Sequence, residues 1–90
     1  MKATVGTKVQ AYTGRCVGIL IESTTWEGEI TKVNAKSIRV RLTHATSKFG
    51  GETTAEYDMS REITYRFAKT LSNGKDFYTS EGRIYGHIQI

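Results

Sequence analysis

Hydrophobic residues recur along the chain mainly at every second position, which is the spacing of a β-strand with one buried face. Between the turns the sequence is rich in Val, Ile, Thr, Tyr and Phe, residue types that suit a pleated and half-buried surface. The clearest example is the segment 38–43, where Ile38, Val40 and Leu42 alternate with polar residues. This alternation predicts a strand with one apolar face and one basic face.

Residues 26–42 are expected to form one hairpin around an Asn-Ala-Lys turn. Pairing Ile30 with Val40 places both side chains on the buried face. The same register sets Glu29 opposite Arg41 on the other face, where opposite charges across a strand pair are favourable. One register therefore satisfies both faces of the hairpin.

The first part of the chain predicts two more strands. Residues 5–12 alternate between apolar and polar side chains and lead to an expected turn at Gly14 and Arg15. The following segment, 16–22, is almost continuously apolar, which predicts a central strand. Cys16, the single cysteine of the chain, is expected to be a small buried hydrophobic residue in that strand.

The last third of the chain predicts a second hairpin and a terminal strand. Apolar residues over 63–71 share one parity, and an Asn-Gly turn returns the chain. A two-residue turn would put Tyr78 on the face of Phe67, whereas a three-residue loop would put Phe77 there, and the sequence leaves both open. Alternating isoleucines over 84–90 predict a last strand that is paired into the sheet.

The segment 52–62 alone has helical features, with Ala55 and Met59 four residues apart, although its threonines are mediocre helix formers. The expected fold class is therefore all-β and mainly antiparallel, a small barrel or two-layer sheet with at most one short helix near 52–62. No change of composition divides the chain, so residues 1–90 are expected to form a single domain.

Residues 26–42 read Trp-Glu-Gly-Glu-Ile-Thr-Lys-Val-Asn-Ala-Lys-Ser-Ile-Arg-Val-Arg-Leu, and this segment resembles the central hairpin of SH3-like barrels. Modules of the KOW and Tudor types share its order of glycine, isoleucine, polar turn and alternating valines. The resemblance implies that the small barrel is SH3-like. Residues 44–90 are an elaboration that the resemblance does not explain.

Catalytic and metal-binding signatures are missing from the sequence. His44 and His87 are far apart and have no second ligand at strand or helix spacing, and Cys16 lies in an apolar segment. Glu27 and Glu29 project from one strand face, where solvated strand charges are the usual interpretation. No glycine-rich phosphate loop is present. We therefore expect no enzyme activity, no catalytic residue, no metal site, no cofactor and no small-molecule substrate.

Charge is distributed unevenly along a chain whose net charge is +4. Between Ile30 and Gly51 there are no carboxylates, and this stretch holds five basic residues in addition to His44. A basic hairpin of this kind could bind a phosphate backbone, and nearby aromatic rings such as Phe49, Tyr12 and Tyr85 could stack on bases. The candidate nucleic-acid-binding residues are Lys32, Lys36, Arg39, Arg41 and Lys48.

The number of aromatic residues indicates a different function, because a small core cannot readily enclose nine large rings. Exposed rings are typical anchors of protein interfaces. We therefore expect a non-enzymatic binding module that mediates protein interaction or assembly as an accessory protein, through a protein partner or self-association. The alternative is a nucleic-acid-binding domain that uses the basic hairpin 30–48. Rings beside that hairpin would favour the alternative, and rings in an apolar patch away from it would favour protein binding.

The expected location is the cytoplasm, with no membrane partner. No apolar run approaches the roughly 20 residues that cross a bilayer, and the first residues lack the apolar segment of a signal peptide.

Overall fold

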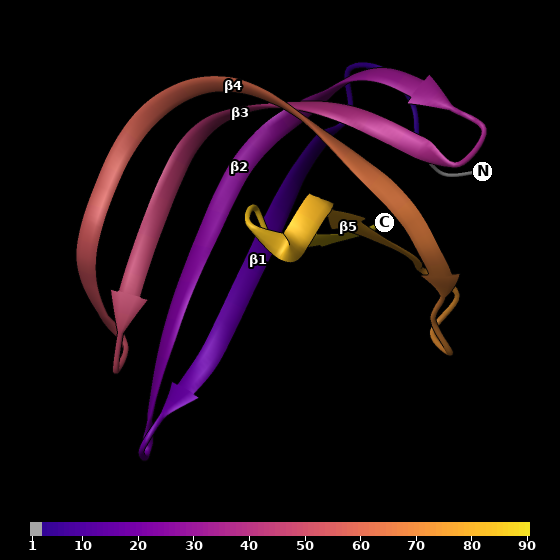
Figure 1. Cartoon of the computed structure of the whole chain (residues 1–90). Helices are drawn as coiled ribbons and strands as arrows, with labels where there is room; N and C mark the ends of the chain where they lie inside the picture. Colours follow the sequence, from indigo (N-terminus) through magenta and orange to yellow (C-terminus); the bar gives the residue numbers. More distant parts are fainter. Residues whose placement is uncertain (1–2) are drawn as a thin grey trace.

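The computed structural model describes residues 3–90 and shows six antiparallel strands that close into one small barrel (Figure 1). Each strand pairs with the next, and the last pairs back with the first. The 3-10 turn η1 (Glu81–Arg83) is the only helical segment within the described residues. The predicted all-β antiparallel fold is confirmed, as a barrel. The strands are β1 (Lys8–Val17), β2 (Leu20–Asn34), β3 (Ser37–Phe49), β4 (Glu52–Thr70), β5 (Asp76–Ser80) and β6 (His87–Gln89).

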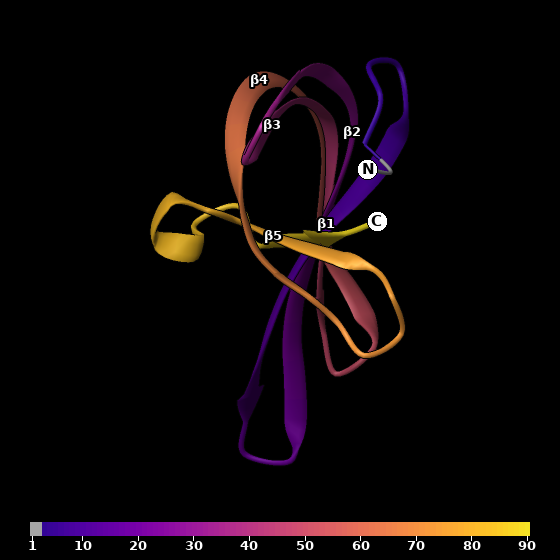
Figure 2. The same ribbon diagram turned by 90° about the vertical axis from the view of Figure 1, so that its right-hand side faces the viewer.

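The first four strands are much longer than the last two, and their extra length extends beyond the barrel. β5 pairs with β4 only over 65–70, and β6 pairs with β1 only over 11–12. Among the described residues, the remaining parts of β1 to β4 pair only with one another and form an open four-stranded sheet. We call this sheet, residues 13–25 and 44–60, the wing. Figure 1 and Figure 2 show its two hairpins leaving the barrel in the same direction.

The core of the barrel is built from the alternate positions that the sequence pattern predicts. The strand segment 38–42 buries its three apolar side chains completely and exposes both arginines. Ile30 pairs with Val40, and Glu29 pairs with Arg41, so the predicted hairpin register is confirmed. Tyrosine, alanine and tryptophan side chains complete the core together with further aliphatic ones; these residues are Ala3, Val9, Ala11, Trp26, Ala45, Tyr65, Tyr78 and Ile88.

β-Bulges mark the place where the wing leaves the barrel. The register between β2 and β3 shifts between Glu27 and Gly28, and the register between β3 and β4 shifts between Leu42 and His44. A side chain on Gly28 would bring its first carbon to 2.5 Å from the carbonyl oxygen of Arg41. Bulges bend a sheet and increase its twist. Glycine at this position therefore allows the same strands to serve both the barrel and the wing.

Three predictions for residues 14–22 are wrong. β1 continues through Gly14 to Val17, and the chain turns at Gly18, whose φ is +64°. Gly14 is a strand residue covered by the side chain of Tyr12, because the hydroxyl oxygen of that tyrosine occupies the space that a Cβ would need. The apolar segment 16–22 is the end of a hairpin instead of a central strand, and Cys16 is exposed there instead of buried.

The segment 52–62 is part of β4 and not a helix. Its backbone pairs with β3 from Glu52 onward, after a turn at Gly50 and Gly51 in which both residues have positive φ. Long-range strand pairing thus outweighs the weak helical spacing of Ala55 and Met59.

The second hairpin places Tyr78, and not Phe77, opposite Phe67. The connecting loop, residues 71–75, is longer than either predicted loop. A register shift after Phe67 nevertheless puts Tyr78 on the face of Phe67, as a two-residue turn would have done. The terminal strand is paired into the barrel as predicted, since β6 lies between β5 and β1, but it covers only 87–89 of the predicted 84–90, and Ile84 lies in an exposed turn. Within residues 3–90, no helix is long and apolar enough to cross a membrane.

The buried face of β3 should dominate stability. We expect Ile38→Ala and Val40→Ala each to lower the free energy of unfolding by roughly 1 to 4 kcal/mol, because each removes fully buried methyl groups. Arg39→Ala should change it by no more than about 0.5 kcal/mol, since that side chain is half exposed. Urea denaturation of the three variants measures these values, and a larger loss for Arg39→Ala would mean that the strand is oriented the other way.

Candidate functional site

Four of the five predicted basic residues lie at the barrel end of the β2–β3 hairpin. Lys32 and Arg39 pair across the two strands, Arg41 follows on the same outer face, and Lys36 lies in the turn. Lys48 is separate from them. It lies nine residues beyond Arg39 on β3, about 30 Å along an extended strand, and belongs to the wing.

Two charged residues of β4 join this surface, and the sequence analysis did not assign them to it. Arg66 pairs with Ser37 and adds a cation, and Glu62 adds a carboxylate. Both have the opposite parity to the buried Tyr65, which is the signal that could have placed them on the outer face. We call the surface formed by Lys32, Lys36, Arg39, Arg41, Glu62 and Arg66 the basic face.

Glu62 neutralises much of the basic face. Its carboxylate lies 3.0 Å from a guanidinium nitrogen of Arg41 and 3.7 Å from one of Arg39. The side chains of both arginines are about half exposed. Glu29 is opposite Arg41 in register, as predicted, but the guanidinium turns to Glu62, where one carboxylate serves two arginines. Both arginines therefore already have a carboxylate partner.

The wing carries the largest group of exposed hydrophobic side chains. Ten large hydrophobic residues are exposed among the described residues, and six of them belong to the wing. The Ile19 side chain at the end of the first hairpin is 101% exposed, and Ile21 is 55% exposed. We call these six the apolar wing residues; they are Val17, Ile19, Leu20, Ile21, Phe49 and Tyr57.

Most of the apolar wing residues share one face of the sheet. Tyr57 pairs with Ala45, which is fully buried, and both side chains therefore point to the face that continues into the barrel core. By the same alternation Leu20 and Phe49 lie on this face, while Ile21 points to the other. The wing thus presents apolar side chains on the face that continues into the barrel core, between polar residues that include Arg15 and Glu22.

Backbone hydrogen bonds hold the two hairpin ends of the wing together. The amide of Gly50 donates to the carbonyl oxygen of Ile21 at 2.9 Å, and the Leu20 side chain lies over Gly50. Next to this contact, Arg15 donates from Nε to Glu22 at 3.0 Å. The apolar wing residues are therefore displayed on an ordered support, although water surrounds them.

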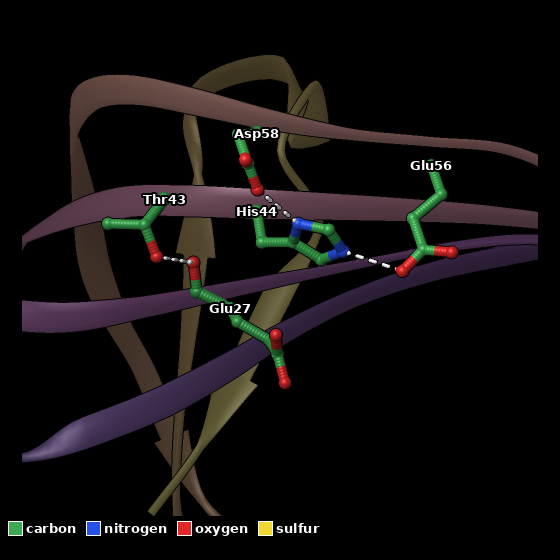
Figure 3. Close-up of polar contacts among 5 residues, drawn as sticks. All are labelled: Glu27, Thr43, His44, Glu56 and Asp58. Carbon is green, nitrogen blue, oxygen red and sulfur yellow. Dashed lines mark hydrogen bonds and ion pairs between the residues drawn. The ribbon is translucent and has the colours of Figure 1, made fainter.

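A histidine connects the strands of the wing near its base (Figure 3). Nδ1 of His44 lies 2.8 Å from Asp58, and Nε2 lies 3.0 Å from Glu56. Both ring nitrogens can donate only when the imidazole is protonated. Hydrogen bonds to Asp58 and then to Glu56 therefore raise the pKa of His44. The Glu27 carboxylate points away from the ring in Figure 3, and no three His, Cys, Asp or Glu side chains in residues 3–90 could hold a metal ion.

A broad groove of about 820 Å³ crosses the outer face of β1, β2 and β6. Lys8 and Glu29 face each other along one side, and the rings of Tyr12 and His87 meet edge to face with their centroids 5.9 Å apart. Within the described residues, no buried side-chain nitrogen or oxygen lacks a hydrogen-bond partner. The groove therefore holds no buried unsatisfied polar group that would indicate a ligand.

The rings proposed for base stacking lie away from the basic face. Phe49 is at the end of the wing, Tyr12 is on β1, and Tyr85 packs edge to face against Trp26 with the ring centroids 5.7 Å apart. One exposed ring does lie close to the basic face, since the amide of Phe67 donates to the Lys36 carbonyl oxygen. Most of the exposed aromatic side chains are therefore separated from the cations of the basic face.

The fold and the site define a small antiparallel β-barrel with a protruding apolar wing. Comparison of the chain with models of known protein families, with curated proteins and with solved structures found no match. The wing and the basic face are therefore the two surfaces from which a function can be inferred.

We expect the two histidines to titrate in opposite directions from the ordinary value of about 6.5. The carboxylate bonds raise the pKa of His44, whereas burial and then the Arg83 charge lower the pKa of His87. NMR titration of the imidazole resonances measures both in one sample. A His44 pKa below that of His87 would contradict the bonding in Figure 3.

The same shift has a consequence for stability. A raised folded-state pKa means that His44 stabilises the fold fully below about pH 6.5 and loses this effect as the pH rises through the folded-state value. The melting temperature of His44→Gln should therefore fall further below that of the parent at about pH 5.5 than at about pH 8.5. Equal deficits at both pH values would show that the charge of His44 does not contribute.

Proposed function

We propose that the protein is a non-enzymatic binding module that attaches to a protein partner through its wing and acts as a cytoplasmic accessory in an assembly. The single observation that supports this most is the concentration of apolar side chains on the wing, with a fully exposed isoleucine at its end. Contiguous exposed apolar surface on a small protein is a common mark of an interaction site.

The energetics of the wing support the same proposal. Burying one exposed aliphatic or aromatic side chain contributes roughly 1.5 to 3 kcal/mol, so a few of the apolar wing residues supply enough driving force for specific binding. The hairpin ends are already held by the Gly50 to Ile21 hydrogen bond and by the Arg15 to Glu22 ion pair. An ordered binding surface loses less entropy on association than a flexible one.

We also propose that the barrel is SH3-like. In support, residues 26–42, which resemble the central hairpin of that class, form the β2–β3 hairpin in the predicted register. A binding function agrees with this class, although a fold alone does not determine a function.

The wing proposal predicts that Ile19 lies at the interface. A photo-crosslinking amino acid at Ile19 should capture a partner in extracts of the source cells, and the same group at Val5 should not. Val5 is a matched control because it is 66% exposed and lies before β1, next to the end of the barrel opposite the wing.

The captured partner is then purified and titrated against variants. Ile19→Ser and Ile21→Ser together should weaken binding at least about tenfold, because roughly 1.4 kcal/mol corresponds to a factor of ten. Val5→Ser should leave binding unchanged, and added salt should have little effect on an apolar contact. Crosslinks that form equally from Val5, or a partner that binds the double variant as tightly as the parent, would contradict the proposal.

The alternative function is nucleic-acid binding by the basic face, with Lys32, Lys36, Arg39 and Arg41 as the phosphate contacts and Lys48 outside the site. The observation that favours it is the gathering of these cations on β2, on β3 and in the turn between them, to which Arg66 of β4 adds one more. Phosphate contacts of this kind give binding that weakens as salt rises. Against it stands Glu62, which holds two of the cations.

Titration with single-stranded and double-stranded nucleic acid at two salt concentrations tests this alternative. If the basic face binds phosphates, replacing Arg39 and Arg41 with alanine should weaken binding and reduce the salt slope by roughly one for each phosphate that is no longer neutralised. Glu62→Gln should strengthen binding, because it releases both guanidinium groups. A folded double arginine variant that binds as tightly as the parent would exclude the basic face.

A further inference from the structure

Both edges of the wing are without a neighbouring strand among residues 3–90. On β1 the edge is open from Thr13 to Val17, because β6 reaches only as far as Tyr12. On β4 the edge is open from Glu52 to Ser60, because β5 begins to pair only at Tyr65. Open edges present rows of unpaired backbone donors and acceptors, which are templates for pairing with another strand.

The two edges lie at the same distance from the end of the wing, and their strands run in opposite directions. The strand registers place Arg15, Glu22, Phe49 and Glu52 in one row across the sheet. β1 runs toward the end of the wing, and β4 runs away from it. A second wing placed beside the first in the same orientation would therefore continue the sheet with an antiparallel strand pair.

The charges of the two edges are complementary. Residues 52–60 carry three carboxylates and no basic residue, whereas residues 13–17 carry Arg15 and no carboxylate. Glu52 makes no ion pair within the described part of the chain, while the carboxylates of Glu56 and Asp58 bind His44. The carboxylate of Glu52 is therefore available for an ion pair, and it lies in the same row of the sheet as Arg15.

We propose that each edge of the wing binds the opposite edge of a second copy of this chain, so that β1 of one copy pairs with β4 of the next, head to tail. This inference rests on the proposed assembly function of the wing. When the rows of two neighbouring copies are aligned, Arg15 of one copy faces Glu52 of the other. Arg15 then lies between that carboxylate and its own Glu22. Thr13 faces Thr54 in the same register, so the new strand pair ends where β6 begins to cover β1.

Pairing of like edges is disfavoured by the same charges. Two β4 edges would bring two sets of three carboxylates together, and like charges directly opposite destabilise a strand pair. Two β1 edges would give neither arginine a new carboxylate. The charge pattern therefore selects the head-to-tail pair.

Head-to-tail pairing also has a structural consequence. Leu20, Phe49 and Tyr57 recur on one face of the wing in each copy, so joined wings repeat these exposed apolar side chains along the assembly. An interface between different surfaces of identical subunits does not end at a dimer. It builds a ring when the rotation between copies closes and a filament when it does not.

Two charge reversals test the inference by mixing. Arg15→Glu alone would set carboxylate against carboxylate, and Glu52→Arg alone would set cation against cation, so each variant should sediment mainly as a monomer. An equimolar mixture offers two kinds of favourable edge pair, the native one and one in which the acidic and basic side chains have exchanged strands. The mixture should therefore recover the large species of the parent. Lys75→Glu, a reversal in the exposed loop between β4 and β5, should assemble like the parent.

Sedimentation velocity over a range of concentrations measures each sample, and circular dichroism verifies that each variant keeps its β-sheet. A parent that stays monomeric at the highest concentration, or two folded variants that do not recover assembly when mixed, would overturn the head-to-tail pairing. Ile19→Ser with Ile21→Ser leaves the backbone of both edges intact and should assemble like the parent while binding the partner captured at Ile19 more weakly. The edge pairing and the partner-binding function can therefore fail separately.

Discussion

The continuous antiparallel pairing of β2 with β3 is the constraint on which the rest of the structure depends. It extends from Asn34 and Ser37 at the turn to Glu22 and Phe49 at the end of the wing. In the barrel this pairing buries apolar side chains on one face, and β5 and β6 close the cylinder. Beyond Trp26 and Ala45 the strands continue without a cover, so backbone hydrogen bonds, instead of a closed core, keep the wing in shape.

The wing therefore combines an ordered backbone with exposed apolar side chains and unpaired backbone groups. Its apolar side chains remain exposed to water. The outer edges of β1 and β4 keep unpaired backbone groups, although each of these strands is paired with its inner neighbour. Burial of both features requires another molecule, because within residues 3–90 no element covers them. The basic face differs in this respect, since Glu62 already satisfies its two central guanidinium groups. This contrast is the physical reason for preferring protein binding to nucleic-acid binding.

Much of the barrel could be predicted from local alternation, whereas the wing could not. The register of Ile30 with Val40 follows from two buried positions and one turn. The segment 16–22 has the composition of a buried strand, but burial depends on which strands cover it, and that is decided by the short lengths of β5 and β6. In the same way, Glu62 reaches the arginines through the pairing of β3 with β4, a contact between residues distant in sequence.

Amide hydrogen exchange of the protein, measured in dilute and in concentrated solution, tests the central claim that the wing is the contact surface. We expect exchange to slow with concentration at residues 13–15 and 52–54, the open-edge residues that pair when Arg15 faces Glu52, while the turn at Ala35 and Lys36 is unchanged. Slower exchange at that turn with no change at either edge of the wing would show that the wing is not the contact surface.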